Sequence, residues 1–157
     1  MFAKNLNQEG HWMRLYPIEY QPPSMKDEGS SSSSHLPIVM LVDDNDIILT
    51  TLSDYLQSEG FEVIACQSGK DAVAQAKIHK PALIVMDIQM PEMDGIETTQ
   101  RIKADKNLAA IPIIALTALA MKSDRERCLA VGINDYISKP VSLQNLVAII
   151  KRHLNID

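Results

Sequence analysis

One short stretch, residues 82–95, does most to limit what this chain can fold into. Its first five residues, 82–86, are all apolar, and such a run is too short for a membrane span but typical of a strand buried on both faces. The run ends at an acid, Asp87. Pro91 then disfavours an immediate helix, because proline pushes the residue before it out of the α region. The pattern predicts that Asp87 stands at the carboxyl end of a central parallel strand, where open α/β sheets bind their ligands.

The same alternation runs through the chain from Ile38 to its end. Strand-like apolar runs occupy residues 38–42, 61–66, 82–86 and 111–116, and a weaker pattern indicates a fifth strand at 133–137. Helical patterns begin near Asn45, Ser68, Gly95, Lys122 and Ser142. Five strand–helix units with short connections predict an α/β fold, a doubly wound five-stranded parallel sheet with helices on both faces.

Within these units, local signals place the helix faces and ends. In the first helix, the apolar spacing predicts a buried side made of Ile47, Ile48, Leu52, Tyr55 and Leu56. The second helix has a candidate capping box in Ser68 and Asp71. The last helix, at about 142–154, should bury Leu146, Val147, Ile150 and Leu154.

Composition and charge exclude several classes of protein. The chain has 157 residues, 46% of them hydrophobic, which suits one domain with a real core. Its net charge of -5 gives no sign of a nucleic-acid or membrane partner. Residues 1–10 hold no apolar signal-peptide core, and no apolar run reaches the length of a transmembrane helix. We therefore expect a cytoplasmic protein, with Cys66 and Cys128 serving as small apolar residues rather than as reactive thiols.

The first 36 residues differ from the rest of the chain. Prolines, Gly29 and the run Ser30 to Ser34 give them the composition of a flexible linker. We therefore divide the chain into a tail, residues 1–36, and a folded domain, residues 37–157. The tail also carries aromatic residues, so a disordered tail, a short docking segment and the end of a preceding domain all remain open.

Polar residues of complementary chemistry follow four of the predicted strands. They are Asp43 and Asp44, Asp87, Thr117 and Lys139. Taken singly, each has an ordinary interpretation as a solvated turn, a strand end or an exposed loop lysine. Because the carboxyl ends of parallel strands meet at one edge, their joint occurrence predicts a shared crevice.

Such a set suits phosphoryl transfer. Carboxylates this close repel one another, so either one carboxyl group takes up a proton or a cation is bound. Acidic oxygens with room for water suit Mg²⁺, and the lack of His or Cys in the set argues against zinc. Asp87 can then attack phosphorus, while Lys139 and the hydroxyl of Thr117 stabilise the phosphoryl oxygens.

Residues 37–156 resemble the receiver domains of bacterial two-component response regulators. The matching motifs are Val42-Asp43-Asp44, Met86-Asp87-Ile88-Gln89-Met90-Pro91, Asp94-Gly95, Leu116-Thr117-Ala118 and Lys139-Pro140. The resemblance implies that Asp87 is the phosphoacceptor and that Mg²⁺ is held by Asp43, Asp44, Asp87 and the backbone carbonyl of Gln89. It also implies that the sheet has the flavodoxin-like strand order 2-1-3-4-5.

The resemblance further implies how such a domain signals. Thr117 and Lys139 would contact the phosphoryl group, Tyr136 would be the aromatic switch residue, and the Lys139–Pro140 bond is a candidate cis peptide. The partners would be a histidine kinase or histidine phosphotransfer protein and a downstream protein, with a phosphorylation-dependent dimer as one form of output. The wording around Asp87 is most similar to receivers attached to hybrid histidine kinases or to standalone relatives. No DNA-binding domain is expected.

Two other hypotheses remain beside this one. Asp44-Asn45-Asp46 after an apolar strand resembles the nucleophile motif of haloacid-dehalogenase-like phosphatases, which would make the chain an enzyme. That family also needs a late acid pair, and the strand at 111–116 is followed by Thr117 and Ala118 instead. The second alternative is a receiver-like module that binds partners without phosphorylation. On the favoured hypothesis the chain is a regulatory phosphoacceptor that catalyses only its own phosphorylation and dephosphorylation.

Overall fold

Strands and helices alternate without exception along the folded part of the chain. The structure is a computed structural model that describes residues 35–118 and 121–157. The predicted tail, residues 1–36, lies almost wholly outside these described residues. The elements are β1 Ile38–Val42, α1 Asp46–Ser58, β2 Glu62–Cys66, α2 Gly69–His79, β3 Leu83–Asp87, α3 Gly95–Ala104, β4 Ile113–Thr117, α4 Lys122–Ala130, β5 Asp135–Ser138 and α5 Leu143–Leu154.

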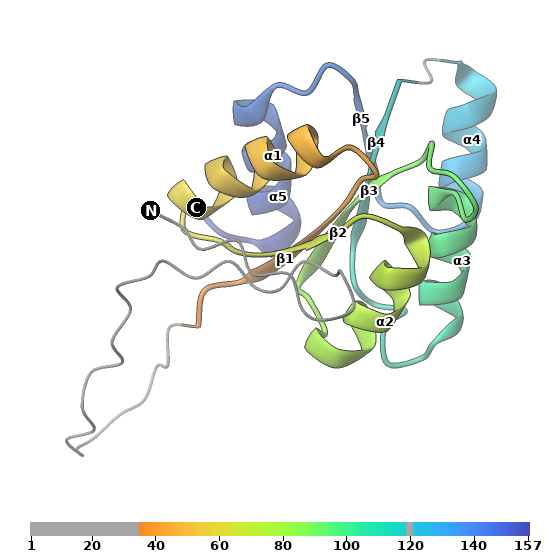
Figure 1. The fold of residues 1–157 in the computed structure, drawn as a ribbon, viewed down its shortest axis with the longest axis horizontal. Coiled ribbons are helices and arrows are strands. Elements are labelled where there is room, and N and C mark those ends of the chain that lie inside the picture. The colour runs from red at the N-terminus through yellow and green to blue at the C-terminus, as the bar shows by residue number, and fades with distance from the viewer. Residues whose placement is uncertain (1–34, 119–120) are drawn as a thin grey trace.

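All strands belong to one parallel sheet with the order β2-β1-β3-β4-β5. Helices α1 and α5 cover one face, and α2, α3 and α4 cover the other (Figure 1). Central strand β3 is buried along its whole length, as its continuous apolar run predicted. The predicted fold class and strand order are confirmed.

Each face of the sheet has its own hydrophobic core, because successive strand residues point to opposite faces. Val39 and Leu41 of β1 pack with α1 and α5, whereas Met40 and Val42 pack with α2, α3 and α4. The two cores hold the sheet between two helical layers. They fix the carboxyl ends of the strands at the upper edge of the molecule in Figure 1.

Capping side chains set where four helices begin. Asn45 accepts hydrogen bonds from two backbone N–H groups in the first turn of α1, and Ser68, Asp94 and Ser142 each accept one in α2, α3 and α5. Such caps satisfy N–H groups that have no partner within the helix. Each of the four caps lies in the loop that follows a strand, so these hydrogen bonds also help to fix the loops at the carboxyl edge.

The structure corrects the predicted face of α1. Ile47 is 76% exposed, while Leu49, which was not predicted to be buried, is 2% exposed. The buried residues of α1 are Leu49, Leu52, Ser53 and Leu56. Ile47 lies two positions before Leu49, about 200° around the helix, and therefore points away from the sheet.

Two strands begin two residues later than predicted. β4 begins at Ile113 rather than at residue 111, and the intervening Pro112 has no backbone N–H to donate to a neighbouring strand. β5 begins at Asp135, although Ile133 is buried as an apolar residue should be. Asn134 precedes β5 and pairs with Ile113 through both its side chain, at 2.9 Å, and its backbone N–H, at 2.8 Å.

Within the described ranges, no helix has the length and apolarity needed to span a bilayer.

The corrected burial pattern predicts unequal effects of two truncations. Leu146→Ala should lower the free energy of unfolding by about 2–5 kcal/mol, because Leu146 is 0% exposed in the core under α5. Ile47→Ala should change it by no more than about 0.5 kcal/mol, since that side chain lies in solvent. Urea unfolding of both variants measures the difference, and similar losses would contradict the assignment of the helix faces.

Candidate functional site

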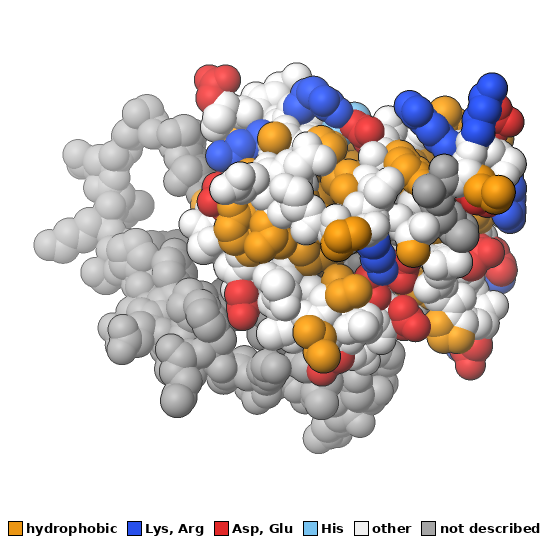
Figure 2. All heavy atoms as spheres, turned by 90° about the horizontal axis from the view of Figure 1, so that it is seen from above, with side chains coloured by type: hydrophobic (Ala, Val, Ile, Leu, Met, Phe, Trp, Pro, Cys, Tyr) orange, Lys and Arg blue, Asp and Glu red, His pale blue; other side chains and the backbone are white. Residues whose placement is uncertain are grey.

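The predicted site residues converge at the carboxyl edge of the sheet. Asp43 follows β1, Asp87 ends β3, Thr117 ends β4 and Lys139 follows β5. These strands are neighbours in the order β1-β3-β4-β5, so their carboxyl ends lie side by side. Figure 2 looks onto this face and shows acidic side chains gathered around a basic one near its centre.

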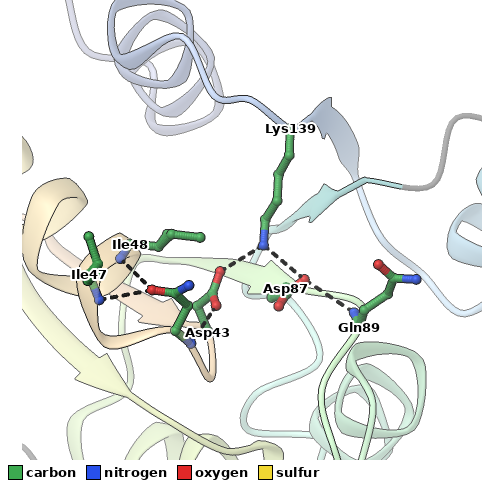
Figure 3. Close-up of polar contacts among 7 residues, drawn as sticks. Asp43, Ile47, Ile48, Asp87, Gln89 and Lys139 are labelled. Atoms are coloured by element: carbon green, nitrogen blue, oxygen red, sulfur yellow. Dashed lines mark hydrogen bonds and ion pairs between the residues drawn. The ribbon is translucent and has the colours of Figure 1, made fainter.

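Lys139 connects the acids of two strands. Its Nζ lies 3.0 Å from Asp43 Oδ2 and 3.4 Å from Asp87 Oδ1, and Figure 3 shows the side chain reaching down between them. The Lys139 backbone N–H donates to the carbonyl of Thr117 at 2.9 Å, which fixes the start of the loop after β5. The Lys139–Pro140 peptide bond is cis. The ion pair thus joins Lys139 to Asp43, which lies 96 positions earlier in the sequence.

Asp87 is a buried carboxylate whose negative charge is only partly balanced by neighbouring groups. It is 3% exposed, and its Oδ1 accepts a hydrogen bond from the backbone N–H of Gln89 at 3.2 Å. Burial and the charge of Asp43 raise the pKa of Asp87 to about 6, while Lys139 and the Gln89 N–H oppose the increase. At neutral pH the group is therefore mainly ionised and carries a charge that its surroundings only partly balance.

The ammonium of Lys139 stays charged in this pocket. Partial burial lowers its pKa, but the hydrogen bond and charge of Asp43, together with Asp87, outweigh that effect and raise the pKa above its ordinary value. An ion pair between a largely buried carboxylate and a lysine with access to solvent leaves the lysine able to shift towards an incoming anion. Lys139 thus both links Asp43 to Asp87 and provides a cation that can bind an anionic ligand.

Asp43 and Asp44 share a turn but have different environments. Asp43 is 2% exposed; its Oδ1 accepts from the Asn45 backbone N–H at 2.9 Å, and its Oδ2 faces Lys139. Asp44 is exposed at the mouth of the site. One acid of the pair is therefore fixed within the pocket, and the other faces solvent.

The acid set fits a hard divalent cation. Asp43, Asp44 and Asp87 each offer a carboxylate oxygen, and these atoms lie within 4.8 Å of one another. The single ammonium of Lys139 leaves the group with an excess of negative charge. Mg²⁺ prefers oxygen ligands and keeps several waters, which the exposed side of the cluster can accommodate. The donors present suit Mg²⁺, and no cysteine or histidine belongs to this cluster.

The remaining predicted site residues lie around this centre. Thr117 is 1% exposed, and it pairs with Ser138 in the ladder between β4 and β5. Tyr136 lies on β5, partly buried against the core of the α2–α3–α4 face. The Gln89 side chain is exposed, and its backbone N–H contacts Asp87.

Sequence reasoning missed the backbone groups that orient the acids. The sequence predicts only that a helix begins near Asn45, yet the Asn45 N–H holds Asp43. It likewise predicts only a helix start near Gly95, yet a Cβ there would lie 2.3 Å from the backbone carbonyl of Asp87. The Asp94-Gly95 pair after an acid-tipped strand was the available signal for such a close approach.

Comparison with known proteins places this geometry in one family. The family model described as response regulator receiver domain matches residues 39–151. The chain is 44% identical to the polar-differentiation response regulator DivK of Brucella ovis over 116 residues, which are 74% of this chain and 94% of that protein.

Solved structures agree in fold. The chemotaxis protein CheY4 of Vibrio cholerae superposes with a TM-score of 0.74 at 28% identity, covering 76% of this chain and 100% of that one. The receiver domain of the sensor histidine kinase PA1611 from Pseudomonas aeruginosa superposes with a TM-score of 0.72 at 37% identity, covering 77% and 99%. That structure holds a magnesium ion coordinated in the active site cleft.

The acid cluster predicts that Mg²⁺ stabilises the fold. A ligand that binds only the folded state adds RT ln(1 + [L]/Kd), about 2.7 kcal/mol at a hundredfold excess over Kd. Thermal unfolding with saturating Mg²⁺ and with a chelator measures this gain. Asp44→Asn should reduce it strongly, because the variant removes one of the three carboxylates.

A matched control is Asp54→Asn, which changes the same charge on the exposed side of α1. That variant should keep the full Mg²⁺ effect. An equal gain in stability for wild type, Asp44→Asn and Asp54→Asn would show that the ion binds elsewhere.

Proposed function

Because this chain belongs to the family of response regulator receiver domains, we propose that Asp87 is the residue on which it accepts a phosphoryl group. Receiver domains are the phosphoacceptors of two-component signalling, and this chain has that role. The observation that supports Asp87 is its position. It ends the central strand, within reach of both the acid pair and the ammonium of Lys139.

The proposed reaction transfers the group from a phosphohistidine of a histidine kinase or histidine phosphotransfer protein. An oxygen of the Asp87 carboxylate forms a bond to phosphorus while the phosphorus–nitrogen bond of the donor breaks. The electron pair of that bond stays on the imidazole nitrogen, and the product is an acyl phosphate. With a pKa of about 6, Asp87 is mainly ionised at neutral pH and so available as the nucleophile.

Lys139 and the acid cluster carry the electrostatic part of the proposal. As the carboxylate charge of Asp87 is replaced by phosphoryl oxygens, Lys139 can follow it, because the lysine is partly exposed and lies 3.4 Å from Asp87 Oδ1. Asp43, Asp44, Asp87 and the Gln89 carbonyl would hold Mg²⁺, which supplies positive charge to the phosphoryl oxygens when bound. The family match gives no support to the haloacid-dehalogenase alternative.

Replacing the acceptor tests this assignment. Asp87→Asn keeps the size of the side chain but removes the nucleophilic carboxylate, so Mg²⁺-dependent uptake of acid-labile phosphate from acetyl phosphate should fall to background. Asp54→Asn should be labelled at the wild-type rate, since its side chain lies on the exposed side of α1. Incorporated phosphate is measured by intact-protein mass spectrometry. Normal labelling of Asp87→Asn would overturn the proposal.

We further propose that Thr117 and Tyr136 carry the signal away from Asp87. The Thr117 hydroxyl is a buried donor on the strand beside Asp87, and movement towards a phosphoryl oxygen would free space that Tyr136 of β5 can enter. Shifting a two-state equilibrium from 1:99 to 99:1 needs about 5.5 kcal/mol. A few charge-assisted hydrogen bonds of about 1.5–3 kcal/mol each are enough for that shift.

This route predicts a separation of chemistry from signalling. Thr117→Ala should still be phosphorylated on Asp87. Its phosphorylated form should favour the state in which Tyr136 has entered the space beside β4 by about 1.5–3 kcal/mol less than wild type does, because one charge-assisted hydrogen bond is missing. NMR signals of the Tyr136 ring, recorded before and after labelling, measure the bias. A full wild-type response of Tyr136 in the Thr117→Ala protein would exclude this route.

A further inference from the structure

We propose that Gly69, the first residue of α2, is a positioning residue for phosphoryl transfer at Asp87. The inference rests on the proposed function and concerns the β3–α3 loop, residues 88–94, which carries the groups that orient Asp87. Gly69 belongs to α2, not to this loop, and has no side chain that could bind a ligand. It would act by leaving space into which the loop and α3 can pack.

The packing around Gly69 is too close for any side chain. A Cβ at this position would lie 2.1 Å from Thr98 Oγ1, 3.0 Å from the backbone carbonyl of Met93 and 3.1 Å from Met93 Cγ. The first contact is far shorter than two non-bonded atoms allow, and the second involves backbone that cannot rotate away. Gly69 therefore sets how closely the amino terminus of α2 approaches the β3–α3 loop.

Met93 lies near the end of that loop, and Thr98 lies in the first turn of α3, where it is bonded to the last loop residue. The Thr98 hydroxyl donates to the backbone carbonyl of Asp94 at 2.7 Å, and the Thr98 N–H donates to the same carbonyl at 3.0 Å. Asp94 in turn caps α3 by accepting from the Glu97 N–H at 2.8 Å. A side chain at position 69 would push on Thr98 and Met93, and so on the junction between the loop and α3.

The far end of the loop is tied to this junction. The Gly95 N–H donates to the carbonyl of Ile88 at 3.0 Å, which closes the loop on itself. Ile88 and Met90 are buried in the core below, so the loop has few ways to absorb a shift. The next residue after Ile88 is Gln89, whose N–H holds Asp87 Oδ1. A displacement that begins at Gly69 therefore reaches the acceptor carboxylate.

The alternative is that Gly69 only allows α2 and α3 to pack closely. The two interpretations predict different measurements. Loss of packing lowers thermal stability and leaves the site unchanged in the folded protein. Loss of positioning also weakens Mg²⁺ binding and slows phosphorylation, since changes in the groups that orient metal ligands typically cost about 10–100-fold in affinity or activity.

The test is a double-mutant cycle on the full chain of 157 residues with Gly69→Ala, Thr98→Ala and the combination. Mg²⁺ affinity is measured by calorimetry, and the rate of Asp87 labelling by acetyl phosphate is measured by mass spectrometry. We expect Gly69→Ala to weaken both by about tenfold. The double variant should recover part of that loss, because it removes the closest contact but keeps the one with the Met93 carbonyl.

Gly132→Ala is the matched control. Gly132 has a φ of +96°, so alanine is strained there and lowers stability, but the three atoms nearest to its Cβ would all belong to the flexible Lys103 side chain, at 3.5–3.7 Å. This position follows α4, at the edge opposite to the acids. Gly132→Ala should lower the melting temperature while keeping wild-type Mg²⁺ affinity and labelling rate.

Three results would overturn the inference. The first is wild-type affinity and labelling in Gly69→Ala with only its melting temperature lowered, as in the control. The second is a double variant no better than the sum of its single variants. If Gly69→Ala does not fold, the double variant is compared with Thr98→Ala, which tests the remaining contact with Met93. The third result that would overturn the inference is equal Mg²⁺ affinity and equal labelling rate in these two variants. Failure of the proposed function itself is visible separately, as labelling of Asp87→Asn or absence of labelling in wild type.

Discussion

The contact of the Lys139 ammonium with Asp43 and Asp87 is the interaction on which the rest of this site depends. Two buried carboxylates from neighbouring strands repel each other, and the lysine, 3.0 Å from one and 3.4 Å from the other, offsets that repulsion. The contact requires the carboxyl ends of β1, β3 and β5 to lie at one edge, which the parallel order provides. Fold and site are therefore linked, because the run β1-β3-β4-β5 places the two acids and the lysine at the same edge.

The lysine does not neutralise the site. Asp44 adds a third carboxylate, and the pKa of Asp87, raised to about 6 by burial and by Asp43, shows that negative charge remains uncompensated. This excess makes the donor set suitable for a divalent cation. On the proposed function, an incoming phosphoryl group, itself anionic, would be stabilised by that cation as well as by Lys139.

Most of the fold and the charged centre could be predicted from the sequence because both depend on local patterns. The apolar run before Asp87 and the acid, hydroxyl and lysine after the other strands specify which groups meet at the edge. The exposed Ile47 shows where that reasoning fails, since apolar spacing alone did not fix the rotation of α1 about its axis. The approach of Gly69 to Thr98 could not be predicted either, because it joins two helices that are separated in sequence by β3 and involves no side chain at one partner.

Rigidity at the acceptor determines where a signal can appear. Asp87 ends a strand buried along its whole length, and the loop after it is held by the buried side chains of Ile88 and Met90. A phosphoryl group on Asp87 therefore cannot be accommodated by moving the acceptor strand. The groups that we propose to respond lie beside it: the partly exposed Lys139, the Thr117 hydroxyl and the partly buried Tyr136 ring. All three lie on β4 and β5 or directly after them, so the change should spread from that side of the sheet to α4 and α5.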